Sequence, residues 1–130
     1  MKKNKWVISL YLILAVFSIP HLIDDFLFDI PLEFGISNRT AQILAGVFIL
    51  IFMLIFMELV QGQKRGVYGA MFMGSFLALA GILKHIPLII KSGPYWSGWF
   101  SEGLIIGMII TGIALLISGS ISLKADPDAV

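Results

Sequence analysis

Two histidines, His21 and His85, are the only imidazoles in a 130-residue chain that has no cysteine. Asp24 and Asp25 follow His21 at i+3 and i+4, so the three side chains share one helical face. Together with His85 from a second helix, they offer two nitrogens and one or two carboxylates. That donor set suits zinc, iron, manganese or copper(II). The pattern therefore predicts that His21, Asp24, Asp25 and His85 hold a divalent transition metal.

Haem b is the other cofactor that this histidine pair could bind. His21 and His85 would clasp the iron axially from two helices, and these ligands would set its potential. Gly81, one turn before His85, would leave room for the porphyrin edge. Lys84 and Glu102 would lie around the ligands, although Lys84 is expected to point about 100° away from His85. A metal or haem centre for membrane electron transfer or redox chemistry is our first hypothesis.

Two alternatives use the same residues without a cofactor. In the structural alternative, Asp24 or Asp25 pairs with Lys84, the histidines donate hydrogen bonds, and the network holds two helices together in a non-catalytic assembly subunit. An ionisable group within a span costs at least about 2.5–3.5 kcal/mol near the bilayer centre, so pairing or access to water is expected. In the other alternative, the residues line a pocket for a small sterol- or quinone-like molecule.

The segment Ser18-Ile19-Pro20-His21, followed by Asp24 and Asp25, resembles the first span of the EXPERA group of four-span sterol isomerases and sigma-2-type receptors. The resemblance covers only this short segment, and the long polar loops of that group are absent from this chain. It implies a pocket for a lipophilic ligand, on which an aspartate or histidine acts by hydrogen bonding or proton transfer. No residue receives a catalytic role from the sequence, and enzymatic activity stays open.

The composition defines the class of protein that must position these residues. Hydrophobic residues make up 58% of the chain and charged residues 13%, and the mean hydropathy is +0.97. Soluble domains carry about 45–50% apolar and about 25% charged residues. The composition excludes a soluble enzyme, a nucleic-acid-binding protein and a disordered linker. It predicts an integral membrane protein in contact with the lipid bilayer, alone, as a homo-oligomer or with another membrane protein.

Four segments are long and apolar enough for a transmembrane helix, which needs about 20 residues. They cover residues 6–28, 41–61, 67–90 and 99–119, in one membrane domain over 1–130 with a short cytoplasmic tail at 120–130. Ser37 or Asn38 is expected to cap the second helix. The first segment continues past Pro20 without an A-x-A site, which favours a retained span over a signal peptide. We expect an antiparallel bundle of four helices.

Basic residues mark the side of the membrane on which the termini lie. The positive-inside rule places both termini in the cytoplasm, in a plasma membrane, because one side collects most of the basic residues: Lys2, Lys3, Lys5, Lys64, Arg65 and Lys124. His21 and His85 then lie at similar depth in the outer leaflet, each next to a proline. The sequence does not establish whether the two histidines meet.

Small residues indicate which helices pack closely in lipid. In the third segment they are Ala70, Gly74, Ala78 and Gly81, and in the fourth Gly103, Gly107, Thr111, Ala114 and Ser118. We expect these two stripes to face each other. The second segment is bulky throughout, and a broad part of its surface is expected to face lipid.

Overall fold

The structure is a computed structural model, and it describes residues 5–33, 35–91 and 97–125. All elements in these ranges are helical: α1 (Lys5–Leu27), α2 (Ile30–Glu33), α3 (Asn38–Val60), α4 (Lys64–Ala80), the π-helical turn η1 (Gly81–His85), α5 (Ile86–Ile90) and α6 (Trp99–Ala125). Within them, four helical stretches are long and apolar enough to cross a membrane: Lys5–Leu27, Asn38–Val60, Lys64–Ile90 and Trp99–Ala125. The prediction of an all-helical membrane protein with four membrane-length helices is confirmed.

Two helix ends lie a few residues from their predicted positions. α3 begins at Asn38, and the Ser37 hydroxyl accepts a hydrogen bond of 3.2 Å from the Thr40 N–H. α6 continues past Gly119 to Ala125. The Ser120 hydroxyl donates to the Leu116 carbonyl at 2.7 Å, so this serine is accommodated within the helix. Of the predicted tail, residues 126–130 lie outside the described residues.

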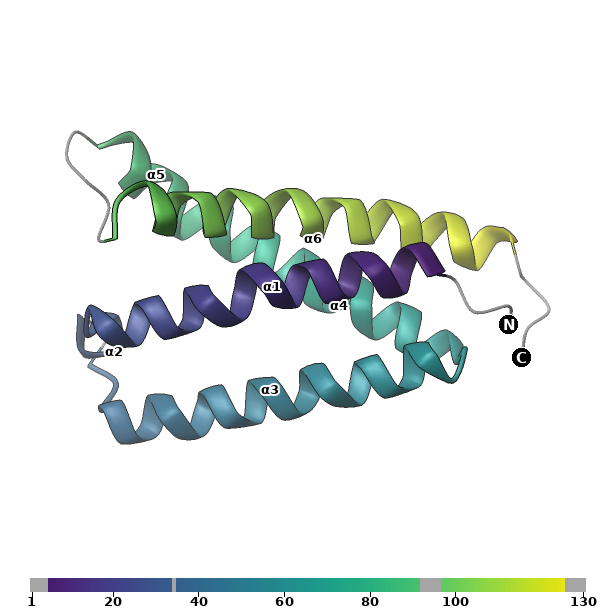
Figure 1. The fold of residues 1–130 in the computed structure, drawn as a ribbon, viewed down its shortest axis with the longest axis horizontal. Coiled ribbons are helices and arrows are strands. Elements are labelled where there is room, and N and C mark those ends of the chain that lie inside the picture. Colours follow the sequence, from purple (N-terminus) through teal and green to yellow (C-terminus); the bar gives the residue numbers. More distant parts are fainter. Residues whose placement is uncertain (1–4, 34, 92–96, 126–130) are drawn as a thin grey trace.

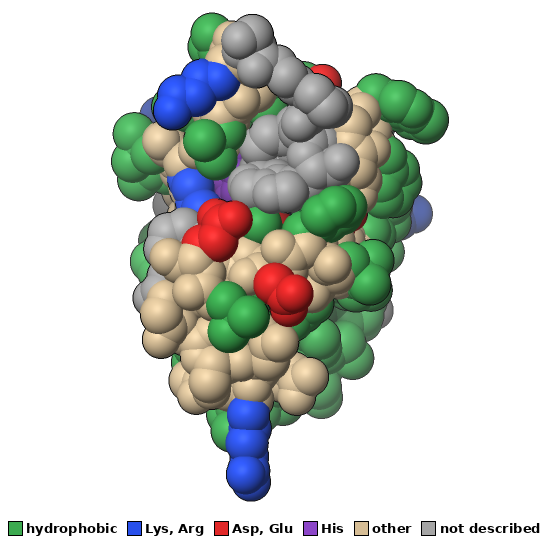
Figure 2. All heavy atoms as spheres, turned by 90° about the vertical axis from the view of Figure 1, so that its left-hand side faces the viewer, with side chains coloured by type: hydrophobic (Ala, Val, Ile, Leu, Met, Phe, Trp, Pro, Cys, Tyr) green, Lys and Arg blue, Asp and Glu red, His purple; other side chains and the backbone are tan. Residues whose placement is uncertain are grey.

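The long helices run back and forth between two ends of the molecule (Figure 1). One end holds the beginning of α1, the turn between α3 and α4, and the end of α6. The other end holds α2 and α5. Figure 2 looks onto that second end, where a small patch of histidine lies beside basic side chains, acidic side chains lie nearby, and apolar side chains dominate the flanks. The polar residues singled out in the sequence therefore gather near one end of the bundle.

α4 and α6 form the most extensive helix contact, and glycines bring their backbones together. A Cβ on Gly74 would lie 3.0 Å from the Gly112 carbonyl oxygen, and a Cβ on Gly112 would collide with the Gly74 carbonyl oxygen. Close packing of these helices is thus confirmed, but the face of α6 differs from the predicted one. Gly107 faces Phe17 of α1, and Gly103 faces open space. The reason is that α6 packs against α1 as well as α4, so its small residues are divided between two neighbours.

α3 is the least buried of the four membrane-length helices, as its bulky sequence predicts. Its contact with α1 is much smaller than that between α4 and α6. The Tyr11 ring stacks on Phe52 with centroids 4.2 Å apart, and its hydroxyl donates to the Phe52 carbonyl at 3.1 Å. This contact fixes α1 against α3 at mid-length. Between it and α2, the two helices line a cavity.

Candidate functional site

Helix irregularities accompany both histidines. Pro20 lies within α1, directly before His21. η1 ends at His85, and the Ile86 N–H bonds to the Gly81 carbonyl five residues back. Pro87 follows; it has no N–H to donate, and its ring disfavours the normal α-helical carbonyl approach from Leu83. A π-turn widens the helix and accommodates this site.

Lys84 and His85 both belong to this π-turn and both line the cavity. Successive side chains in a π-turn are separated by about 80° rather than the 100° of an α-helix. His85 is buried whereas Lys84 is half-buried. The structure therefore places Lys84 in the same cavity wall as His85.

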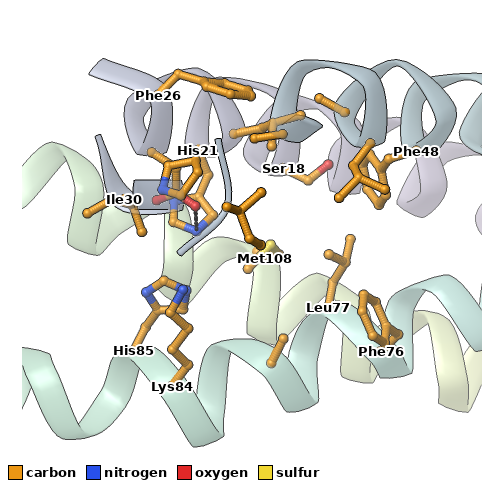
Figure 3. A pocket seen from close by; sticks show the side chains of 18 residues that line it. Ser18, His21, Phe26, Ile30, Phe48, Phe76, Leu77, Lys84, His85 and Met108 are labelled. Atoms are coloured by element: carbon orange, nitrogen blue, oxygen red, sulfur yellow. Dashed lines mark ion pairs between the residues drawn. The ribbon is translucent and has the colours of Figure 1, made fainter. Parts of the chain in front are cut away.

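The two histidines meet across the interior of the bundle. The ring centroids of His21 and His85 lie 4.9 Å apart, with the rings at 79° to each other. Both side chains are buried, at 6% and 4% exposure. Figure 3 shows them approaching from α1 and η1, with Lys84 beside His85. The contact joins the first helix of each half of the chain, which the sequence alone could not establish.

Asp25 belongs to this cluster. Its Oδ2 lies 3.9 Å from His21 Nε2, one helical turn away, and its side chain is one-fifth exposed (21%). A neutral imidazole with its proton on Nε2 would point that proton toward the carboxylate. We refer to His21, Asp25, Lys84 and His85 as the polar cluster.

Asp24 faces a different helix. Its Oδ2 accepts a 2.6 Å hydrogen bond from the Ser101 hydroxyl, and its Oδ1 accepts one from the Ser97 hydroxyl. Ser97 lies two residues before α6 and Ser101 lies in its first turn, where the helix dipole favours a negative charge. Asp24 thus bonds toward α6, whereas Asp25 lines the cavity with His21. The predicted ligand set is split between the polar cluster and a buried junction of α1 with α6.

The polar cluster closes one end of a cavity of about 380 Å³. Apolar side chains from every membrane-length helix form most of the wall, which also includes α2 (Figure 3). The lining comprises Ser18, Leu22, Phe26, Ile30, Pro31, Ile36, Ala41, Leu44, Ala45, Phe48, Phe76, Leu77, Ala80 and Met108, in addition to the polar cluster. The site is thus an apolar chamber with a charged and hydrogen-bonding end.

Ser18 is a cavity residue to which the sequence analysis gave no role of its own. It lies one turn before His21 on α1 and is 4% exposed. Within the described residues, its Oγ has no hydrogen-bond partner, and neither does His21 Nδ1. Buried polar atoms in proteins are normally paired, and an unpaired one costs about 1–3 kcal/mol. The signal in the sequence was the i, i+3 spacing of Ser18 and His21.

Gly81 and Glu102 lie outside the cavity wall. A Cβ on Gly81 would come within 2.7 Å of Ile109 Cγ1, so α6 fills the space that a porphyrin edge would need. Glu102 is half-buried in the first turn of α6, where its carboxylate suits the helix dipole. Neither residue lines the cavity.

The geometry of the histidine pair does not fit an axially ligated haem. With metal–nitrogen bonds of about 2 Å on opposite faces of a porphyrin, the ring centres would lie at least about 6 Å apart. The observed 4.9 Å leaves no space for the macrocycle. For a metal ion, no group of three or more suitable His, Asp or Glu side chains occurs among residues 5–33, 35–91 and 97–125.

Comparisons with known proteins find no matching family model, no matching curated protein and no matching solved structure. The fold and the site define an all-helical protein with four membrane-length helices and a partly open amphiphilic cavity between them. Chemically, such a cavity can enclose an apolar molecule and hydrogen-bond to its polar end.

Proposed function

We propose that this protein binds a small, neutral lipophilic molecule with a polar head group. The observation that carries the proposal is the apolar cavity of about 380 Å³ that ends in the polar cluster. Binding sites for small molecules span about 300–1,000 Å³ and combine apolar walls with a few convergent polar groups. The cavity has both properties.

The charges at the polar end favour a neutral head group. Asp25 and Lys84 both line this end, beside His21 and His85. A carboxylate ligand would approach the Asp25 carboxylate, and an ammonium ligand would approach Lys84; like charges repel strongly where water is scarce. A hydroxyl or carbonyl group instead finds donors and acceptors without an ionic conflict.

Lipophile binding replaces the metal or haem centre as the preferred hypothesis. The haem arrangement fails on the distance between the histidine rings. Asp24, one of the predicted metal ligands, has its two carboxylate oxygens engaged by Ser97 and Ser101. A ligand pocket needs neither Asp24 nor Gly81.

Orientation in the membrane is part of the proposal. The positive-inside rule puts both termini and the turn with Lys64 and Arg65 on the cytoplasmic side of a plasma membrane. The cavity then lies in the outer leaflet. A lipophilic ligand would therefore reach it from the outer half of the bilayer or from the external face.

A matched pair of variants on α3 tests the proposal. Ala45 lines the cavity, whereas Val47 is 48% exposed and lies outside the cavity wall. Ala45→Phe should fill the cavity, and Val47→Phe adds the same ring to the outside of the helix. The probes are decyl-substituted 1,4-benzoquinone, 4-decylphenol, cholesterol and dodecanol, each titrated against the purified protein in mild detergent.

A binding protein should show a thermal shift with at least one probe, because a ligand specific to the folded state stabilises it. The shift should survive Val47→Phe and disappear in Ala45→Phe. The proposal fails if no probe shifts the wild-type protein, or if Ala45→Phe responds as the wild type does. An absorption spectrum and an elemental analysis of the same sample provide a separate check, and a stoichiometric metal or a Soret band would support the cofactor hypothesis instead.

A further inference from the structure

We infer that the cavity is built for a ring with two oxygens in para positions, the chemistry of a 1,4-quinone or hydroquinone. The inference rests on the proposed function and specifies its ligand class. Its basis is that the cavity wall carries polar groups at two levels, whereas a sterol-like or simple alcohol head needs one.

The first level is the polar cluster, in which His21 and Asp25 come from α1 and Lys84 and His85 from η1. These side chains converge on one end of the cavity, and together they can both donate and accept hydrogen bonds. One oxygen of a ligand would bind there, whether it is a carbonyl or a hydroxyl.

The second level is the Ser18 hydroxyl. Ser18 also lines the cavity, and only 4% of its surface is exposed. Its Oγ has no hydrogen-bond partner in the described parts of the chain. Rotation about a single side-chain bond moves this hydroxyl between staggered positions, so it can turn to a bound ligand. An unsatisfied hydroxyl in an otherwise apolar wall carries a free-energy cost that a ligand oxygen would remove.

The rise between the two levels is close to the length of such a ring. Ser18 and His21 are separated by three residues, or about 4.5 Å along the helix axis, and the para oxygens of a six-membered ring are about 5 Å apart. A planar ring would span this distance while its faces contact the apolar wall, which includes Phe26, Phe48 and Phe76. Aromatic side chains pack well against flat rings. An alkyl tail on the ring would extend from the cavity toward lipid.

Three probes with the same decyl tail test this geometry under anaerobic conditions: decyl-1,4-hydroquinone, decylcatechol with adjacent hydroxyls, and 4-decylphenol with one hydroxyl. Wild-type protein should bind the hydroquinone about tenfold more tightly than the other two, the equivalent of one hydrogen bond at the upper end of its usual net strength. Ser18→Ala should abolish that advantage and leave phenol binding within about twofold. Ser120→Ala, a serine in α6 that bonds to Leu116, is the matched control and should bind all three as the wild type does.

The outcomes separate the ligand class from the function. If the three probes bind wild-type protein equally, or if Ser18→Ala weakens all three equally, the para-dioxygenated ring is excluded. If cholesterol or dodecanol binds and the ring compounds do not, the lipophile-binding function stands and this inference falls. If none of the lipophiles binds, the proposed function itself fails.

Discussion

The contact between α4 and α6 differs from the contact between α1 and α3 in how closely the helices approach each other. At the first, glycines on both helices bring the backbones close together. At the second, α1 and α3 meet mainly through Tyr11 and Phe52, and the space toward α2 stays open. Close packing requires small side chains, and an internal cavity requires large ones that keep the helices apart. We therefore expect substitutions at the first region to act mainly on stability and substitutions around the cavity to act on the proposed ligand binding.

The largest effect should come from disrupting the tight contact. Gly112→Leu places a side chain against the Gly74 carbonyl, which is backbone and cannot move away without separating the helices. Overpacking of this kind costs about 3 kcal/mol. The matched control is Gly103→Leu, since nothing lies within 4 Å of a Cβ there. Unfolding in mixed detergent–SDS micelles should show a large loss for the first variant and little for the second. Equal losses would contradict the assignment of α4–α6 as the stabilising contact.

Neighbouring aspartates should separate stability from binding. Asp24→Asn weakens charge-assisted hydrogen bonds from Ser97 and Ser101 at the beginning of α6, and hydrogen bonds to charged groups contribute about 1.5–3 kcal/mol. Asp25→Asn changes the polar end of the cavity and should instead weaken the ligand-induced thermal shift. Unfolding and ligand titration on both variants check this. If Asp24→Asn abolishes binding at unchanged stability, the division between the two carboxylates is incorrect.

A smaller effect is expected where α1 meets α3. Tyr11→Phe removes the hydroxyl that donates to the Phe52 carbonyl and keeps the stacked ring. The expected loss is about 1 kcal/mol, the net contribution of a neutral hydrogen bond. Ligand binding should persist, because Tyr11 does not line the cavity. A loss of binding equal to that of Ala45→Phe would mean that this contact shapes the cavity as well.

The smallest effect on folding should be that of Ser18→Ala. The Ser18 hydroxyl has no partner in the described structure, so its removal breaks no hydrogen bond within the protein. Stability without ligand should stay within about 0.5 kcal/mol of wild type or rise slightly, since an unsatisfied buried group is lost. Thermal unfolding of the ligand-free protein measures this. A large loss of stability would show that Ser18 has a structural partner.

Composition and helix length were enough to predict the four membrane-length helices, because apolar runs of this size have few other folds available. The pairing of α4 with α6 also followed from small residues. The faces in contact did not, since periodicity along one helix cannot reveal that α6 has two neighbours. At the site, the sequence singled out His21 and His85, and the structure brings their rings into contact at the cavity. The π-turn over Gly81–His85 could not be predicted, because the α-helical period does not represent it.

Asp24 illustrates a further limit of sequence reasoning. Residues at i, i+3 and i+4 share a broad helical face, but that face can be divided between two neighbouring helices. Only the position of α6 shows that Ser97 and Ser101 engage Asp24. Ser18 is the reverse case, because the sequence analysis assigned it no role and the structure draws attention to it. A small polar residue of this kind becomes a candidate only when its environment is known to be apolar and without hydrogen-bond partners.

The π-turn between α4 and α5 has the geometry of one additional residue inserted into a helix. The residues of α4 before Gly81 keep the register that packs α4 against α6. The residues after the turn are rotated relative to that register. Deletion of a single residue at this point would therefore change the direction of the Lys84 and His85 side chains without altering the contact between Gly74 and Gly112. In evolutionary terms, insertion or deletion of one residue at this turn would change the lining of the cavity while the contact between α4 and α6 stays the same.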